Sequence, residues 1–100
     1  MNELQSQLND MALYATADCA DNEGVWFEGY SGGYYEGRAD AIGRVSGPIL
    51  NGFDPATALI QVKSAIEEWE EEEIGKDERL DGFLAGLKEV LEVLEAFQNL

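Results

Sequence analysis

The segment from Asp54 to Phe97, DPATALIQVKSAIEEWEEEEIGKDERLDGFLAGLKEVLEVLEAF, determines the fold class. Asp54 followed by Pro55 indicates a helix start, because an acidic N-cap accepts backbone N–H bonds and proline fits the first helical position. Apolar residues then recur every three or four positions, at Leu59, Val62, Ile66 and Trp69 and again at Leu80, Phe83, Leu84, Leu87, Leu91, Leu94 and Phe97. This spacing predicts a helix over 55–73 and a second that starts at Asp77 or Asp81. Ile74-Gly75-Lys76 separates them, so we expect an antiparallel αα-hairpin.

The N-terminal residues carry the same helical period. Small and apolar side chains recur at Leu4, Leu8, Met11, Ala12 and Ala15, and Asn2 can cap the first turn. The pattern predicts a helix over 3–17 and a connection over 18–22.

The middle of the chain allows two interpretations. Gly29, Gly33, Gly37 and Ala41 fall four residues apart, and so do Trp26, Tyr30, Tyr34, Arg38 and Ile42. A period of four is a helical ridge, so we favour a helix over about 23–46 that Gly47-Pro48 ends or kinks. Each interior glycine costs about 1 kcal/mol relative to alanine, which close packing of a neighbouring helix must offset. The alternative is a β-hairpin at about 24–36 with a glycine turn.

These segments predict an all-α fold, a single helical domain over 1–100 that forms a bundle of about four helices. The hairpin alternative would make the fold α+β. No apolar run reaches the ~20 residues that span a bilayer, and the first residues lack the pattern of a signal peptide. With a single cysteine, Cys19, the chain forms no internal disulfide. We therefore expect a cytoplasmic protein.

Charge is the strongest compositional signal. The chain has 21 Asp and Glu against 6 Lys and Arg, a net charge of −15. Such a charge repels nucleic acid and anionic lipid, and it favours basic partners. We therefore expect no direct nucleic-acid binding and no membrane binding.

Catalysis is not expected. The chain has no histidine, which removes the usual Ser-His-Asp and Cys-His arrangements, and it has no phosphate-binding G-x-x-x-x-G-K-[ST] loop. Cys19 stands between Asp18 and Asp21, which disfavour a thiolate. One cysteine and no histidine also exclude a structural zinc site, and the acidic loops break the calcium-ligand series. We expect neither an enzyme nor a metal or cofactor.

Two clusters are candidate partner-binding sites. The first is the acidic run Glu67, Glu68, Glu70, Glu71 and Glu72, whose like charges at i and i+4 destabilise a helix and oppose its dipole. A row of carboxylates at the helical rise can imitate nucleic-acid phosphates, although a solvated helix face is equally compatible with it. The second comprises Trp26, Tyr30 and Tyr34, which are core residues or exposed interface anchors.

In length, charge, lack of catalytic signatures and the pairing of an acidic helical half with the Gly29-Tyr30 to Gly37 segment, the chain resembles small acidic phage anti-CRISPR proteins. The resemblance is to inhibitors of type I surveillance complexes and covers the whole chain, without a shared motif. It implies a stoichiometric blocker in the host cytoplasm that binds basic protein subunits and prevents target DNA binding.

The alternative function is a bacterial helical adaptor or dimeric regulator. In that case the Gly29, Gly33, Gly37, Ala41 stripe or the Leu80–Phe97 face would be a self-association surface, and a homodimer would form.

Overall fold

The structure, a computed structural model, describes residues 2–21, 31–70 and 78–98. It contains four α-helices and, in these ranges, no strand: α1 Glu3–Asp21, α2 Ser31–Leu50, α3 Pro55–Glu70 and α4 Glu78–Gln98. The all-α bundle predicted from the sequence is therefore confirmed. The proposed β-hairpin is wrong where it can be judged, because residues 31–36 are helical. Its remaining part, residues 24–30, lies outside the described residues.

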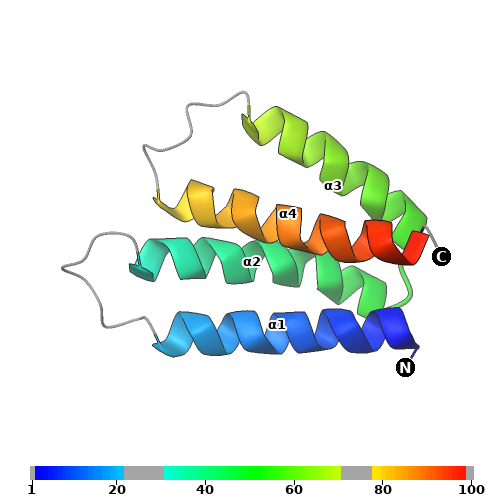
Figure 1. The fold of residues 1–100 in the computed structure, drawn as a ribbon, viewed down its shortest axis with the longest axis horizontal. Helices are drawn as coiled ribbons and strands as arrows, with labels where there is room; N and C mark the ends of the chain where they lie inside the picture. The colour runs from blue at the N-terminus through cyan, green and yellow to red at the C-terminus, as the bar shows by residue number, and fades with distance from the viewer. Residues whose placement is uncertain (1, 22–30, 71–77, 99–100) are drawn as a thin grey trace.

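The four helices form two helical hairpins side by side, in the spatial order α1, α2, α4, α3 (Figure 1). Helices α2 and α4 run in the same direction at the centre, and α1 and α3 run antiparallel to them on the outside. The α2–α4 interface is the largest in the molecule. The predicted α3–α4 hairpin is therefore present, but its second helix packs mainly on α2.

The starts of two helices follow from local chemistry. At α1, Asn2 Oδ1 accepts the Gln5 N–H at 2.8 Å, and Gln5 Oε1 accepts the Asn2 N–H at 3.2 Å, a reciprocal capping box. At α3, Asp54 Oδ2 accepts the Thr57 N–H at 3.2 Å and the Thr57 hydroxyl at 2.8 Å. Both predicted caps are confirmed.

Helix α2 ends later than the sequence indicates, and Pro48 lies inside its last turn. The end is a Schellman motif: Phe53 N–H donates to the Pro48 carbonyl at 2.9 Å and Gly52 N–H donates to the Ile49 carbonyl at 3.1 Å. Gly52 has a φ of +102°, which glycine adopts without strain. Asn51-Gly52 therefore ends α2, and Pro48 lies within the helix one turn before this end.

Helix α1 also extends past its expected end at residue 17, because Asp18–Asp21 continue the helix. Asp18 points toward Arg38 of α2, whose Nη1 lies 3.2 Å from its Oδ2. The pairing gives this acidic end of the helix a cation that the local sequence does not supply. Helix α4 begins at Glu78, so Asp81, one of the two expected starting residues, already lies within it.

The core runs through all four helices, and Leu8, Ile42, Ile49, Val90 and Leu94 are each at most 2% exposed. Residues that the sequence assigned to apolar stripes fill it, including Val62 and Ile66 of α3 and Leu84 and Leu87 of α4. The helical period therefore predicted the buried faces correctly.

Glycines set the distance between α2 and α4. A Cβ on Gly82 would overlap the Tyr34 carbonyl oxygen, and one on Gly37 would overlap the Arg79 carbonyl oxygen. A Cβ on Gly86 would lie 2.6 Å from the Arg38 carbonyl oxygen. Backbone therefore packs directly on backbone, and this glycine seam (Gly37 and Ala41 against Gly82 and Gly86) is the close packing that the α2 glycines were expected to require. The α4 glycines were not predicted to take part.

One polar group in the core is unsatisfied. Ser46 is 1% exposed, and its hydroxyl has no hydrogen-bond partner in the described part of the chain. A buried hydroxyl without a partner costs about 1–3 kcal/mol of desolvation.

Ser46→Ala is therefore expected to raise the free energy of unfolding by about 1 kcal/mol, to which the higher helix propensity of alanine contributes up to about 0.5 kcal/mol. Urea unfolding followed by circular dichroism measures the change. The matched control is Ser64→Ala on the exposed side of α3, which gains the propensity contribution alone. A Ser46→Ala variant less stable than wild type would show that the hydroxyl is bonded.

Candidate functional site

The acidic run begins on the outer side of α3. Ala58, Val62 and Ile66 of this helix are buried, and Glu67 and Glu68 are exposed to solvent. At 100° per residue Glu67 lies opposite the buried stripe, so α3 presents its carboxylates away from the rest of the molecule. Position and exposure of both residues agree with the sequence prediction.

Glu70 differs from its two neighbours. Its Oε1 lies 3.6 Å from Nζ of Lys88 on α4, a solvent-exposed ion pair that links the two helices. Such a pair contributes at most about 1 kcal/mol. Glu67 and Glu68 have no ion pair in the part of the chain that the structure describes, so the fold itself does not compensate their charge.

Four of the predicted site residues cannot be placed. Glu71, Glu72, Trp26 and Tyr30 lie outside the described residues. Tyr34, the last member of the aromatic set, lies on α2 and is half-buried. Its ring meets that of Tyr35 edge-on at 5.5 Å between centroids. Tyr34 therefore contributes to packing in the first turn of α2. None of the contacts described joins it to Glu67 or Glu68.

A second set of carboxylates, on α4, was not predicted. Glu89, Glu92 and Glu95 fall three residues apart, with Glu92 exposed and the other two half-buried. Their spacing on a helix whose other side carries Leu87, Leu91 and Leu94 indicates a polar helix face. The prediction of an acidic site was based on the contiguous glutamates of α3 alone.

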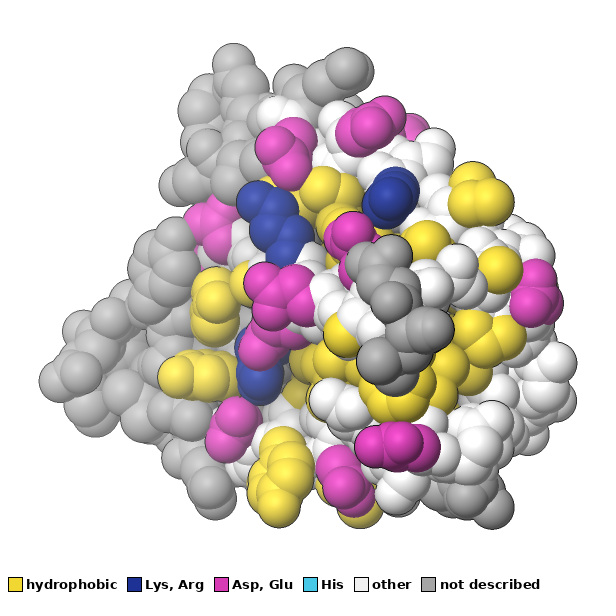
Figure 2. Space-filling view, turned by 45° about the vertical axis from the view of Figure 1, so that its right-hand side comes forward, with side chains coloured by type: hydrophobic (Ala, Val, Ile, Leu, Met, Phe, Trp, Pro, Cys, Tyr) yellow, Lys and Arg dark blue, Asp and Glu magenta, His cyan; other side chains and the backbone are white. Residues whose placement is uncertain are grey.

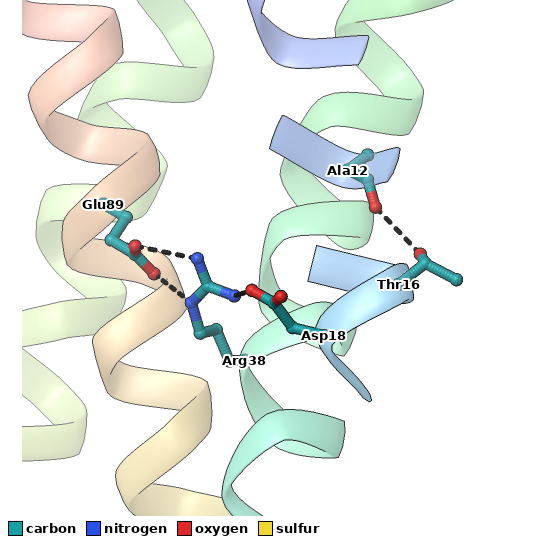
Figure 3. Close-up of polar contacts among 5 residues, drawn as sticks. All are labelled: Ala12, Thr16, Asp18, Arg38 and Glu89. Atoms are coloured by element: carbon teal, nitrogen blue, oxygen red, sulfur yellow. Dashed lines mark hydrogen bonds and ion pairs between the residues drawn. The ribbon is translucent and has the colours of Figure 1, made fainter. Parts of the chain in front are cut away.

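Glu89 belongs to an ion cluster that joins three helices (Figure 3). Arg38 of α2 donates from Nε to Glu89 Oε2 at 2.6 Å and from Nη2 to Glu89 Oε1 at 3.0 Å. Its Nη1 donates to Asp18 Oδ2 of α1 at 3.2 Å. The Arg38 side chain is 18% exposed, and its hydrogen bonds to Glu89 raise its already high pKa. Arg38 therefore links α1, α2 and α4.

The other arginines of the described residues are also engaged. Arg44 Nε donates to both carboxylate oxygens of Asp40, at 3.0 and 3.1 Å. Arg79 lies 3.6 Å from Glu36 and 3.9 Å from Asp40. The three arginines of the described residues therefore all pair with carboxylates of α1, α2 or α4.

The carboxylates do not merge into one block. On the face of the molecule that Figure 2 shows, Asp and Glu side chains are separated by hydrophobic side chains and by a few Lys and Arg side chains.

A shallow groove lies between α2 and α3, with a volume of about 300 Å³. It is lined mostly by apolar side chains: Val45, Pro48, Phe53, Ala58, Val62, Ala65 and Leu87, with Arg44 and Gln61. Arg44 is its only titratable group and is held by Asp40, so the groove contains no pair suited to acid–base chemistry.

No group of three or more Cys, Asp or Glu in the described ranges could hold a metal ion. None of the four helices, as far as they are described, has an apolar stretch long enough to cross a bilayer.

Comparison with known proteins gives no relative: no protein-family model, no curated protein and no solved structure matches the chain.

Proposed function

We propose that the chain is a stoichiometric inhibitor that binds a basic, nucleic-acid-binding surface of a CRISPR-Cas surveillance complex. Bound there, it blocks target DNA, partly because its carboxylates imitate phosphates. The observation that carries the proposal is the exposed, unneutralised pair Glu67 and Glu68 on the outer side of α3. The protein would act without catalysis or cofactor, in the cytoplasm of the host cell.

The charge has an energetic cost that the fold does not recover. A net charge of −15 on 100 residues destabilises the compact state by self-repulsion. Glu67, Glu68 and Glu70 also lie in the last turns of α3, where the helix dipole disfavours anions. A complementary surface of Lys and Arg would convert this cost into binding energy and a fast association rate.

The self-association alternative receives less support from the packing of the surfaces that it would use. Gly37 and Ala41 are packed against α4 in the glycine seam, and Leu84, Leu87 and Leu94 are buried in the core. Gly29 lies outside the described residues. Parts of these faces are thus used within one chain, which favours the inhibitor over self-association through them.

The choice of a CRISPR-Cas complex as partner rests on the resemblance in length, charge and absence of catalytic motifs. The structure supports the more general part of the proposal, an acidic surface directed at a basic partner.

The test is competition with target DNA for a purified type I surveillance complex, measured by fluorescence anisotropy of the labelled DNA. Wild-type protein is expected to displace the DNA, and its inhibition constant should rise steeply with salt. Glu67→Gln/Glu68→Gln is expected to weaken inhibition about fivefold.

The matched control is Glu92→Gln/Glu95→Gln, which removes the same charge from α4 and should change inhibition less than twofold. Equal effects of the two double variants would show that total charge, not α3, determines binding. Failure of the wild-type protein to displace DNA at any salt concentration would refute the proposed partner.

A further inference from the structure

The outer face of α1 exposes two large hydrophobic side chains next to each other. Leu13 is 62% exposed and Tyr14 is 71% exposed, whereas Leu8 and Ala15 on the opposite side of the helix are fully buried. Only two other large hydrophobic residues in the described ranges are exposed, Phe53 and Ile60, and they are isolated from each other in sequence. Helix α1 packs on α2 and α4 only, so this face has no neighbour within the described structure.

The same helix carries negative charge alone. Its sequence includes Glu3, Asp10, Asp18 and Asp21 and no Lys or Arg. Asp10 is exposed one turn before Tyr14, and Glu3 is exposed in the first turn. Asp18 lies one turn after Tyr14 and is already held by Arg38. The exposed hydrophobic pair is therefore bordered by carboxylates and by no cation of its own helix.

We infer that the outer face of α1 docks a basic amphipathic helix of the partner. The apolar ridge of that helix would pack on Leu13 and Tyr14, and Lys or Arg beside the ridge would pair with Asp10 and Glu3. An arginine stacked on the Tyr14 ring would add a cation–π contact. The inference rests on the proposed function, since it adds an apolar contact with the same basic partner, on the opposite side of the bundle from α3.

Charge complementarity selects this occupant. Two copies meeting face to face on α1 would bring Glu3 and Asp10 of one against those of the other, and like charges at an interface disfavour association. An acidic lipid surface is disfavoured for the same reason.

The test uses a synthetic Leu/Lys peptide of about 18 residues, five helical turns, whose order places leucine on one side. Its control is a scrambled peptide of the same composition. Titration of ¹⁵N-labelled protein by NMR is expected to show at least fivefold tighter binding of the ordered peptide, with the largest amide shifts at residues 10–17. Leu13→Ser/Tyr14→Ser should abolish this preference and leave the scrambled peptide bound as before.

Ile60→Ser is the matched control, because Ile60 is 68% exposed on α3. It should retain the preference. Shifts centred on α3, equal binding of the two peptides, or an equal loss in Ile60→Ser would each overturn the inference. So would a wild-type dimer, seen in sedimentation, that Leu13→Ser/Tyr14→Ser dissociates. Failure of DNA competition with an intact peptide preference would refute the proposed function and leave the α1 site standing.

Discussion

Gly82→Ala and Gly37→Ala are each expected to lower the free energy of unfolding by about 2 kcal/mol, although alanine is the better helix former. The added methyl group would overlap a carbonyl oxygen of the facing helix, that of Tyr34 or of Arg79. Since the obstacle is backbone, no side chain can rotate away, and α2 and α4 must separate. Overpacking costs about 1–3 kcal/mol, and we expect a cost of about 3 kcal/mol or more here because the obstacle is backbone. The higher helix propensity of alanine offsets about 1 kcal/mol of this cost.

Gly43→Ala is the control for these variants. Gly43 is an exposed glycine of α2, and a Cβ there meets nothing within 4 Å. Alanine at this position is expected to raise stability by about 0.5–1 kcal/mol. Chemical denaturation of the three variants measures the difference. If Gly82→Ala were as stable as Gly43→Ala, the direct backbone packing of α2 on α4 would be wrong. Should the seam variants not fold at all, the loss of their circular dichroism signal beside a folded Gly43→Ala gives the same conclusion.

Arg38→Met is expected to lower the free energy of unfolding by about 1–2 kcal/mol. Methionine retains the apolar stem but removes the cation that bridges Glu89 and Asp18, and the two carboxylates would then repel each other. The two carboxylate side chains are 41% and 49% exposed, and solvent screening keeps the loss below that of a fully buried pair. Arg38→Lys should recover only part of it, because an ammonium cannot make the bidentate contact.

Arg44→Gln is the comparison, and a change of at most about 0.5 kcal/mol is expected, because the Arg44–Asp40 pair is exposed and within one helix.

The pKa of Arg38 is raised by its hydrogen bonds to Glu89. A base with a raised pKa contributes stability at every pH below its unfolded value and loses it only as pH rises past the folded value. The Arg38→Met deficit should therefore be the same at about pH 7 and about pH 9. A deficit no larger than that of Arg44→Gln would show that the three-helix cluster does not stabilise the fold.

The sequence predicted the elements that depend on local chemistry and periodicity. Asn2 and Asp54 cap helices as expected, and Leu84, Leu87 and Leu94 of the apolar stripe of α4 are buried. The partner of each helix is not a local property. The run of leucines on α4 suggested α3 as its main neighbour, whereas Gly82 and Gly86 allow α2 to approach more closely. Small residues four positions apart on both α2 and α4 indicate that these two helices can pack closely. The prediction used this spacing on α2 but not on α4.

The candidate site was predictable only where it depends on local periodicity, as the fold was. Exposure of Glu67 and Glu68 followed from the helical period of α3. The pairing of Arg38 with Glu89, 51 residues away, and of Glu70 with Lys88 depends on how the helices pack and could not be derived from either segment. The helical period also places Tyr14 outside the apolar stripe of Leu4, Leu8 and Ala15, so its exposure agrees with the sequence pattern.

Direct backbone contact along the glycine seam has a consequence for how the molecule unfolds. A core of leucines can loosen gradually while side chains exchange positions, but two backbones in contact have no intermediate spacing that keeps water out and dispersion contacts intact. The N-terminal and C-terminal hairpins are therefore expected to melt in a single step, each half depending on the other for its order.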